Sequence, residues 1–114
     1  MSDKYKLIIL PEAQTDIRNI IFYITSELAS PQAAMRLQSI FKDTINSLAD
    51  FPKRIKLVDE QPWREAGVRR IRVKNYYIYF VIVEEEHAVK IMAVIYTRRD
   101  QEKQMDMRYR EEGE

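Results

Sequence analysis

Basic side chains are concentrated in one short stretch of the chain, and they are the residues best suited to chemistry. Residues 53–74 hold eight basic residues against three acidic ones, a surplus of five positive charges in a chain whose formal charge is only +1. Guanidinium groups bind phosphate oxygens through paired hydrogen bonds. This stretch is therefore a candidate site for phosphate contacts. Its basic members are Lys53, Arg54, Lys56, Arg64, Arg69, Arg70, Arg72 and Lys74.

Strand alternation divides this stretch into two faces. It places Arg70, Arg72 and Lys74 on one face and Arg69 on the other. A later strand ends in Tyr96, Thr97, Arg98, Arg99 and Asp100. If the two strands are neighbours, cations and tyrosines gather on one sheet face, which suits phosphates and unstacked bases. The same pattern is also typical of a solvated face or a protected sheet edge.

Other kinds of chemistry find little support in the composition. The chain has no cysteine and a single histidine, His87, which lies among three glutamates in a predicted turn. Thiolate catalysis and cysteine-ligated zinc are therefore excluded, and we expect no metal site and no cofactor. No apolar run is long enough for a membrane span, so we expect a cytoplasmic protein with no membrane partner.

Hydrophobic periodicity predicts the elements that must position the basic residues. Apolar residues recur at helical spacing after Pro11 and again after Pro31, and both prolines suit the first turn of a helix. Dense runs of β-branched and aromatic residues predict strands in the second half. We expect strands at 5–10, 68–73, 76–83 and 89–97, and helices at 11–29 and 30–50.

The order of these elements predicts an α+β fold in one domain spanning residues 1–114. The β-α-α-β-β-β order indicates an antiparallel sheet with one face packed on an N-terminal helical hairpin and the other face open. Trp63 is expected to anchor the loop at 53–66 by burying its ring. Residues 101–109 can form a short C-terminal helix with Asp100 as its N-cap. An acidic tail from about residue 110 is expected to be frayed.

Several short motifs, in order, give the chain a resemblance to a known superfamily. They are Pro-Glu-Ala at 11–13, Asp-Ile at 16–17, Leu48 with Phe51 and Pro52, a run from Arg69 to Tyr76, and Arg-Arg-Asp at 98–100. Together they resemble the RelE/ParE superfamily of toxins from bacterial type II toxin–antitoxin systems. That resemblance implies a growth inhibitor with a cognate antitoxin, of the kind associated with plasmid stabilization. The superfamily's fold agrees with the predicted order of elements.

Two activities share that fold, and the resemblance implies different roles for the residues in each. RelE-like members are endoribonucleases (mRNA interferases) that cut mRNA on the ribosome. In that case Arg69, Tyr96 and Arg98 would be catalytic, and Arg70, Arg72, Lys74 and Arg99 would bind RNA. ParE-like members inhibit DNA gyrase without nuclease activity.

The sequence contains arguments for each activity. The basic residues from Arg69 to Lys74, which we call the basic stripe, favour mRNA cleavage, and we take that activity as the first expectation. Tyr77 stands where several ribonuclease members have an arginine, and Tyr96 and Thr97 stand where some have a histidine. Those departures and the Arg-Arg-Asp ending favour the ParE-like alternative. A second alternative is an inactive remnant or a binding module that uses the same surface.

Overall fold

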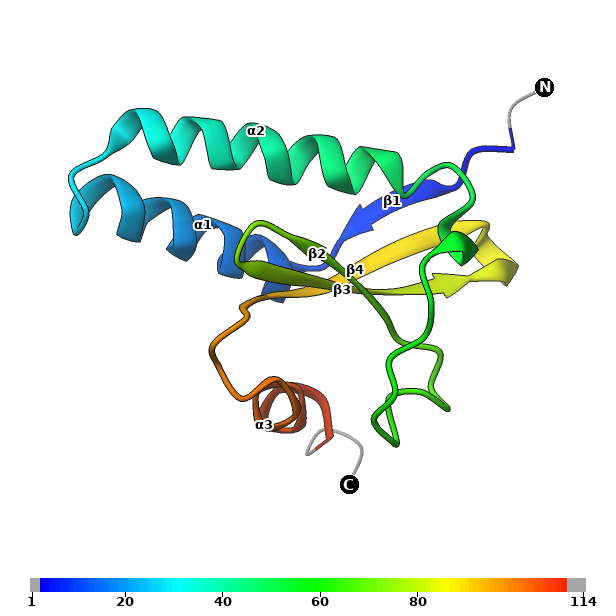
Figure 1. Cartoon of the computed structure of the whole chain (residues 1–114). Coiled ribbons are helices and arrows are strands. Elements are labelled where there is room, and N and C mark those ends of the chain that lie inside the picture. Colours follow the sequence, from blue (N-terminus) through cyan, green and yellow to red (C-terminus); the bar gives the residue numbers. More distant parts are fainter. Residues whose placement is uncertain (1–2, 111–114) are drawn as a thin grey trace.

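A four-stranded sheet lies between a helical hairpin and a short C-terminal helical segment (Figure 1). The computed structural model describes residues 3–110, and the predicted acidic tail beyond them lies outside this range. The α+β class and the order of elements are as predicted. The bounds are β1 Lys6–Ile9, α1 Pro11–Ser26, α2 Pro31–Ser47, β2 Arg69–Val73, β3 Tyr76–Val83, β4 Ala88–Tyr96 and α3 Gln101–Met105. A π-helical turn, Asp106–Arg110, continues α3, and we call Gln101–Arg110 the C-terminal segment.

The sheet is mixed, which corrects the expectation of an antiparallel sheet. Its strand order is β1-β4-β3-β2, and β2, β3 and β4 pair antiparallel as predicted. β1 instead runs parallel to β4, with Lys6 opposite Ala88. This direction lets the chain pass at Leu10 directly into α1, which packs beside β4. A four-residue apolar strand carries no sequence signal for its direction.

The helical hairpin covers one face of the sheet. Pro11 and Pro31 open the two helices, and Ser30, the residue before α2, makes no side-chain capping hydrogen bond. The helices end earlier than predicted, at Ser26 and Ser47. The apolar stripes of both helices pack on one face of β3 and β4. The fully buried members of this core include Phe41, Leu48, Ile78, Phe80 and Ile91.

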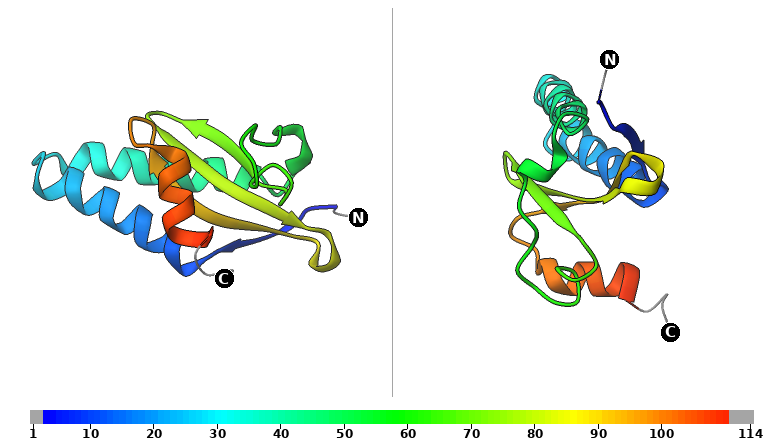
Figure 2. Two further views of the ribbon diagram at one scale, coloured as in Figure 1. Left: turned by 90° about the horizontal axis from the view of Figure 1, so that it is seen from below. Right: turned by 90° about the vertical axis from the view of Figure 1, so that its right-hand side faces the viewer.

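The opposite face of the sheet is covered and not open as expected. Tyr79, Ala93 and Ile95 make this face apolar, so it too must be shielded from water. The loop before β2 and the C-terminal segment supply that cover, and Figure 2 shows the segment and the hairpin on opposite sides of the sheet. Trp63 anchors the loop as predicted, with only 9% of its surface exposed. Asp100 caps α3 as predicted, because its carboxylate accepts the Lys103 N–H at 3.0 Å.

Candidate functional site

Four cations gather at the end of the sheet where β2 turns into β3 and β4 ends. Tyr76 pairs with Tyr96 in the sheet, and the Thr97 N–H donates to the Asn75 carbonyl at 2.8 Å. The β2–β3 turn therefore lies beside the residues that follow β4. We call Arg72, Lys74, Arg98 and Arg99 the cationic end. Within residues 3–110 none of the four has an ion-pair partner, so their charges are available to a ligand.

Two tyrosines at this end, Tyr76 and Tyr96, lie on the side of the helical hairpin. The Tyr76 ring meets Phe41 edge-on at 5.4 Å between centroids and lies 5.6 Å from the ring of Tyr96. Burial, together with the neighbouring Tyr96 and Tyr23, raises the pKa of Tyr76. Tyr76 therefore keeps its proton at neutral pH and is a poor general base.

Arg70 lies on the other face of the sheet, and strand alternation places Arg72 with it. The Arg70 guanidinium is 4.0 Å from the centre of the Tyr77 ring and donates to the Tyr79 hydroxyl at 3.3 Å. That hydroxyl donates in turn to Gln101 of the C-terminal segment at 2.9 Å. The predicted cations and tyrosines thus surround one end of the sheet and do not share a single face.

Arg69 lies apart from the other residues proposed as catalytic. It pairs with Phe80, four residues along β3 from Tyr76, which corresponds to about 13 Å of strand. Its guanidinium donates to the carbonyl oxygens of Ile55 and Lys53 and so holds the loop before β2. Tyr96 and Arg98 are only two residues apart in the chain, whereas Arg69 lies at the far end of its strand.

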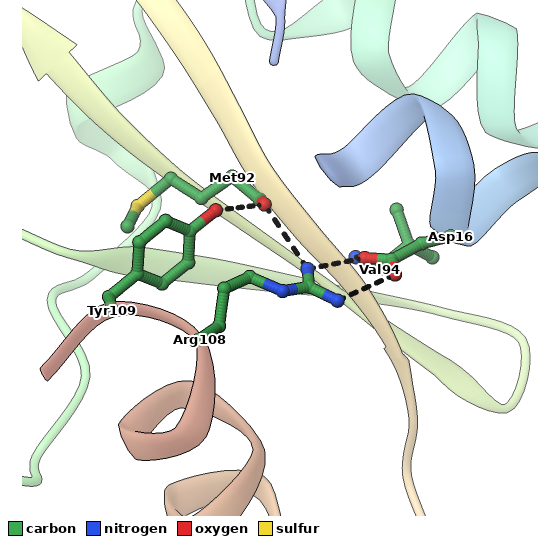
Figure 3. Close-up of polar contacts among 5 residues, drawn as sticks. All are labelled: Asp16, Met92, Val94, Arg108 and Tyr109. Carbon is green, nitrogen blue, oxygen red and sulfur yellow. Dashed lines mark hydrogen bonds and ion pairs between the residues drawn. The ribbon is translucent and has the colours of Figure 1, made fainter. Parts of the chain in front are cut away.

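A polar network ties the C-terminal segment to α1 and to the free edge of β4 (Figure 3). The Arg108 guanidinium donates to both carboxylate oxygens of Asp16, at 2.7 and 2.8 Å. The same carboxylate accepts the Val94 N–H at 2.8 Å, and the Tyr109 hydroxyl donates to the Met92 carbonyl at 2.6 Å. Burial raises the pKa of Tyr109, so that hydroxyl stays protonated and remains a donor.

The sequence contains only a weak indication of this network. Asp16 lies off the apolar stripe of its helix, which predicts either a solvated or an ion-paired carboxylate. Its partner Arg108 is 92 residues away along the chain, so no local spacing could identify it. The sequence feature that could have suggested this ion pair is a carboxylate on a helix of the core together with an arginine in a predicted C-terminal helix.

A groove of about 810 Å³ runs between α1, the end of β4 and the C-terminal segment. We call it the α1 groove. Its volume falls in the range of ordinary ligand sites. Tyr23 and Leu28 line one side and are 54% and 57% exposed. Tyr96 and Arg99 line the other side, so the cationic end and the groove are continuous.

Some kinds of site are not seen in the part of the chain that the structure describes. In residues 3–110 no three histidine, aspartate or glutamate side chains come together as ligands for a metal ion. No helix in that range is both long and apolar enough to cross a membrane. The cationic end and the adjoining groove are the candidate functional surface.

Comparison with known families identifies the family of this chain. Residues 7–101 match the family model described as the ParE toxin of type II toxin–antitoxin systems, parDE. The chain belongs to the ParE toxin family. It is thus a toxin component of a type II toxin–antitoxin system, as the resemblance implied. No curated protein gives a significant match to this ParE-family chain.

Solved structures agree on the fold of this ParE-family toxin. The chromosomal ParDE system of P. aeruginosa matches with a TM-score of 0.69 at 15% identity, over 85% of this chain and 100% of the other. The toxin–antitoxin complex RelBE2 from Mycobacterium tuberculosis gives 0.58 at 17% identity, over 82% and 98%. A mutant of E. coli toxin RelE in the free state gives 0.55 at 15% identity, over 86% and 88%. The TM-scores support a shared fold, whereas identities this low carry no information about mechanism.

Proposed function

We propose that this toxin stops growth by the ParE-like route, by binding DNA gyrase, and does not cleave mRNA. The observation that carries the proposal is the match of residues 7–101 to the ParE toxin family. It reverses the first expectation from the basic stripe, which was ribosome-dependent cleavage. Gyrase works in the cytoplasm, so the proposal agrees with the expectation of a cytoplasmic protein.

The arrangement of proton-transfer groups supports a non-nucleolytic function. General acid–base catalysis requires a group with a suitable pKa within hydrogen-bond reach of the reacting atoms. At the cationic end the tyrosine beside Tyr96, Tyr76, has a raised pKa. His87, the one histidine of the chain, lies just before Ala88 at the opposite end of β4. It stacks on Tyr5 with 4.0 Å between the ring centres, away from the candidate site.

The cationic end suits recognition of an acidic protein surface. Arg98 and Arg99 are exposed and have no ion-pair partner in residues 3–110. Unpaired arginines next to exposed aromatic and apolar side chains are typical of protein–protein contact sites, where charge increases the association rate and aromatic rings supply affinity. Tyr23 and Leu28 supply such apolar surface beside Arg99.

Ribosome-dependent mRNA cleavage is the second candidate, because of the same four cations. Attack by a ribose 2′-hydroxyl on the adjacent phosphate builds negative charge on phosphoryl oxygens, and guanidinium groups stabilise that charge. Arg98, Arg99, Arg72 and Lys74 could provide it with Tyr96 nearby. Expression in bacteria distinguishes these two candidates from an inactive remnant or a binding module, because only an active toxin arrests growth.

Two assays with one protein preparation separate the two activities. The first adds the purified toxin to DNA gyrase and relaxed plasmid and follows supercoiling. The second maps mRNA ends by primer extension in a translating extract. The proposal expects loss of supercoiling and no new ribosome-dependent ends. New ends inside codons, with supercoiling intact, would refute it.

Two variants connect each outcome to the site. Tyr96→Phe removes one hydroxyl and keeps the ring, so gyrase inhibition should stay within about twofold, whereas cleavage that uses this hydroxyl should fall by about a hundredfold or more. Arg98→Glu reverses an exposed charge and should weaken gyrase binding by about tenfold. Arg36→Glu on α2 is the matched control, because Arg36 is also an exposed arginine and lies outside the α1 groove.

A further inference from the structure

The last part of β4 has no neighbouring strand on its outer side. β1 ends at Ile9, and the Leu10 N–H makes the final strand-like bond, to the Ile91 carbonyl at 3.0 Å. β4 continues to Tyr96, and its outer edge there borders the α1 groove. A sheet edge of this kind is a template for an added strand.

The ladder with β3 determines which backbone groups this edge presents. In an antiparallel pair, alternate residues turn both their N–H and their C=O to the same side. The Val94 N–H reaches Asp16 and the Tyr96 carbonyl accepts from the Gln101 side chain at 2.6 Å, so Val94 and Tyr96 face the outer edge. Within residues 3–110 the other two edge groups, the Val94 carbonyl and the Tyr96 N–H, have no hydrogen-bond partner.

These two free groups have the spacing of a parallel bridge. In a parallel ladder, one residue of the added strand donates its N–H to the carbonyl of residue i, and its own carbonyl accepts the N–H of residue i+2. An antiparallel partner would instead need both groups of Val94 or both groups of Tyr96, and each of these residues already has one group bonded. The edge is therefore prepared for a parallel segment, in the same direction as β1.

We propose that the cognate antitoxin inserts an extended segment into the α1 groove, parallel to β4, with one residue bonded to both the Val94 carbonyl and the Tyr96 N–H. The side chains beside the edge define the chemistry of the segment. Arg99 would form an ion pair with an acidic residue of the segment, and the exposed Tyr23 and Leu28 would pack against an apolar residue of it. The proposal rests on membership of a toxin–antitoxin family and is independent of the target of the toxin.

Amide hydrogen exchange at single residues tests the inserted strand directly. In the free toxin the Tyr96 N–H should exchange quickly, because it has no partner, whereas the Ile95 N–H faces β3 and should be protected. Binding of the purified cognate antitoxin should slow exchange at Tyr96 by about a hundredfold or more and leave Ile95 little changed. A complex in which Tyr96 still exchanges as in the free toxin would overturn the proposal.

Charge variants test the acidic partner separately. Arg99→Glu should weaken antitoxin binding by about tenfold, and Arg36→Glu should change it by less than about twofold. Thermal midpoints equal to that of the wild type confirm that both variants are folded. Equal losses in both variants would mean that general charge attraction, and not the groove, holds the segment, which would also overturn the proposal. Both measurements report antitoxin binding, so they remain informative if gyrase is not the target.

Discussion

The contact between Asp16 and Arg108 should make a measurable contribution to stability, because it is polar, largely shielded and joins distant parts of the chain. The two side chains are 14% and 26% exposed, and their two hydrogen bonds are 2.7 and 2.8 Å long. Asp16 also holds the Val94 N–H at the edge of β4. Removing the carboxylate therefore leaves both a guanidinium and a backbone donor without their partner.

The expected size follows from this geometry. A net gain of about 1.5–3 kcal/mol is typical for hydrogen bonds to charged groups, and partial exposure of the pair argues for the lower part of that range. We expect Asp16→Ala to lower the free energy of unfolding by about 2–3 kcal/mol and Arg108→Ala by about 2 kcal/mol. For a chain of this length, the first change corresponds to a fall in thermal midpoint of about 10 °C.

A double-mutant cycle measured by urea unfolding isolates the contact. The coupling between the two substitutions should be about 1–2 kcal/mol. The matched control is the pair Glu86 and Lys90, which lie 3.3 Å apart with side chains 51% and 29% exposed. Its coupling should be below about 0.5 kcal/mol. If the Asp16–Arg108 coupling is as small as that of the control, the contact does not hold the C-terminal segment and the reasoning is wrong.

Three further predictions concern other contacts. The hydrogen-bonded ion pair with Lys53 lowers the pKa of Glu84. The wild type should therefore be more stable than Glu84→Gln above about pH 4.3, and urea titrations should show this advantage disappear as the pH falls through the lowered pKa of the folded state. Arg69→Ala should lower the thermal midpoint by about 4 °C through its lost carbonyl contacts, whereas Arg98→Ala, which is exposed, should stay within about 1 °C. Met105→Ala, at a position only 2% exposed, should cost about 3 kcal/mol and shift the fluorescence of the single tryptophan to the red; an unchanged spectrum would contradict the packing described for the C-terminal segment.

Most of the elements could be predicted because their signals are local. The bounds of β3, Tyr76–Val83, are those predicted from a dense run of β-branched and aromatic residues. Pro11 and Pro31 fixed the starts of α1 and α2, since proline suits the first turn of a helix. The ends of the helices were predicted less exactly. After α1 the chain turns at Ala29, with φ of 48°, and no glycine marks this turn in the sequence.

Residue patterns alone were enough to predict the α+β class, the basic stretch and the likeness to a toxin family. How the site is assembled depends on tertiary contacts. The register of β2 on β3 separates Arg69 from Tyr96, and the short β1 leaves the end of β4 unpaired beside α1. Contacts such as Asp16–Arg108 join residues that are far apart in the chain, and their formation depends on how the strands and helices pack together. Local residue patterns carry no information about that packing, which is why the groove and its free edge were not visible in the sequence.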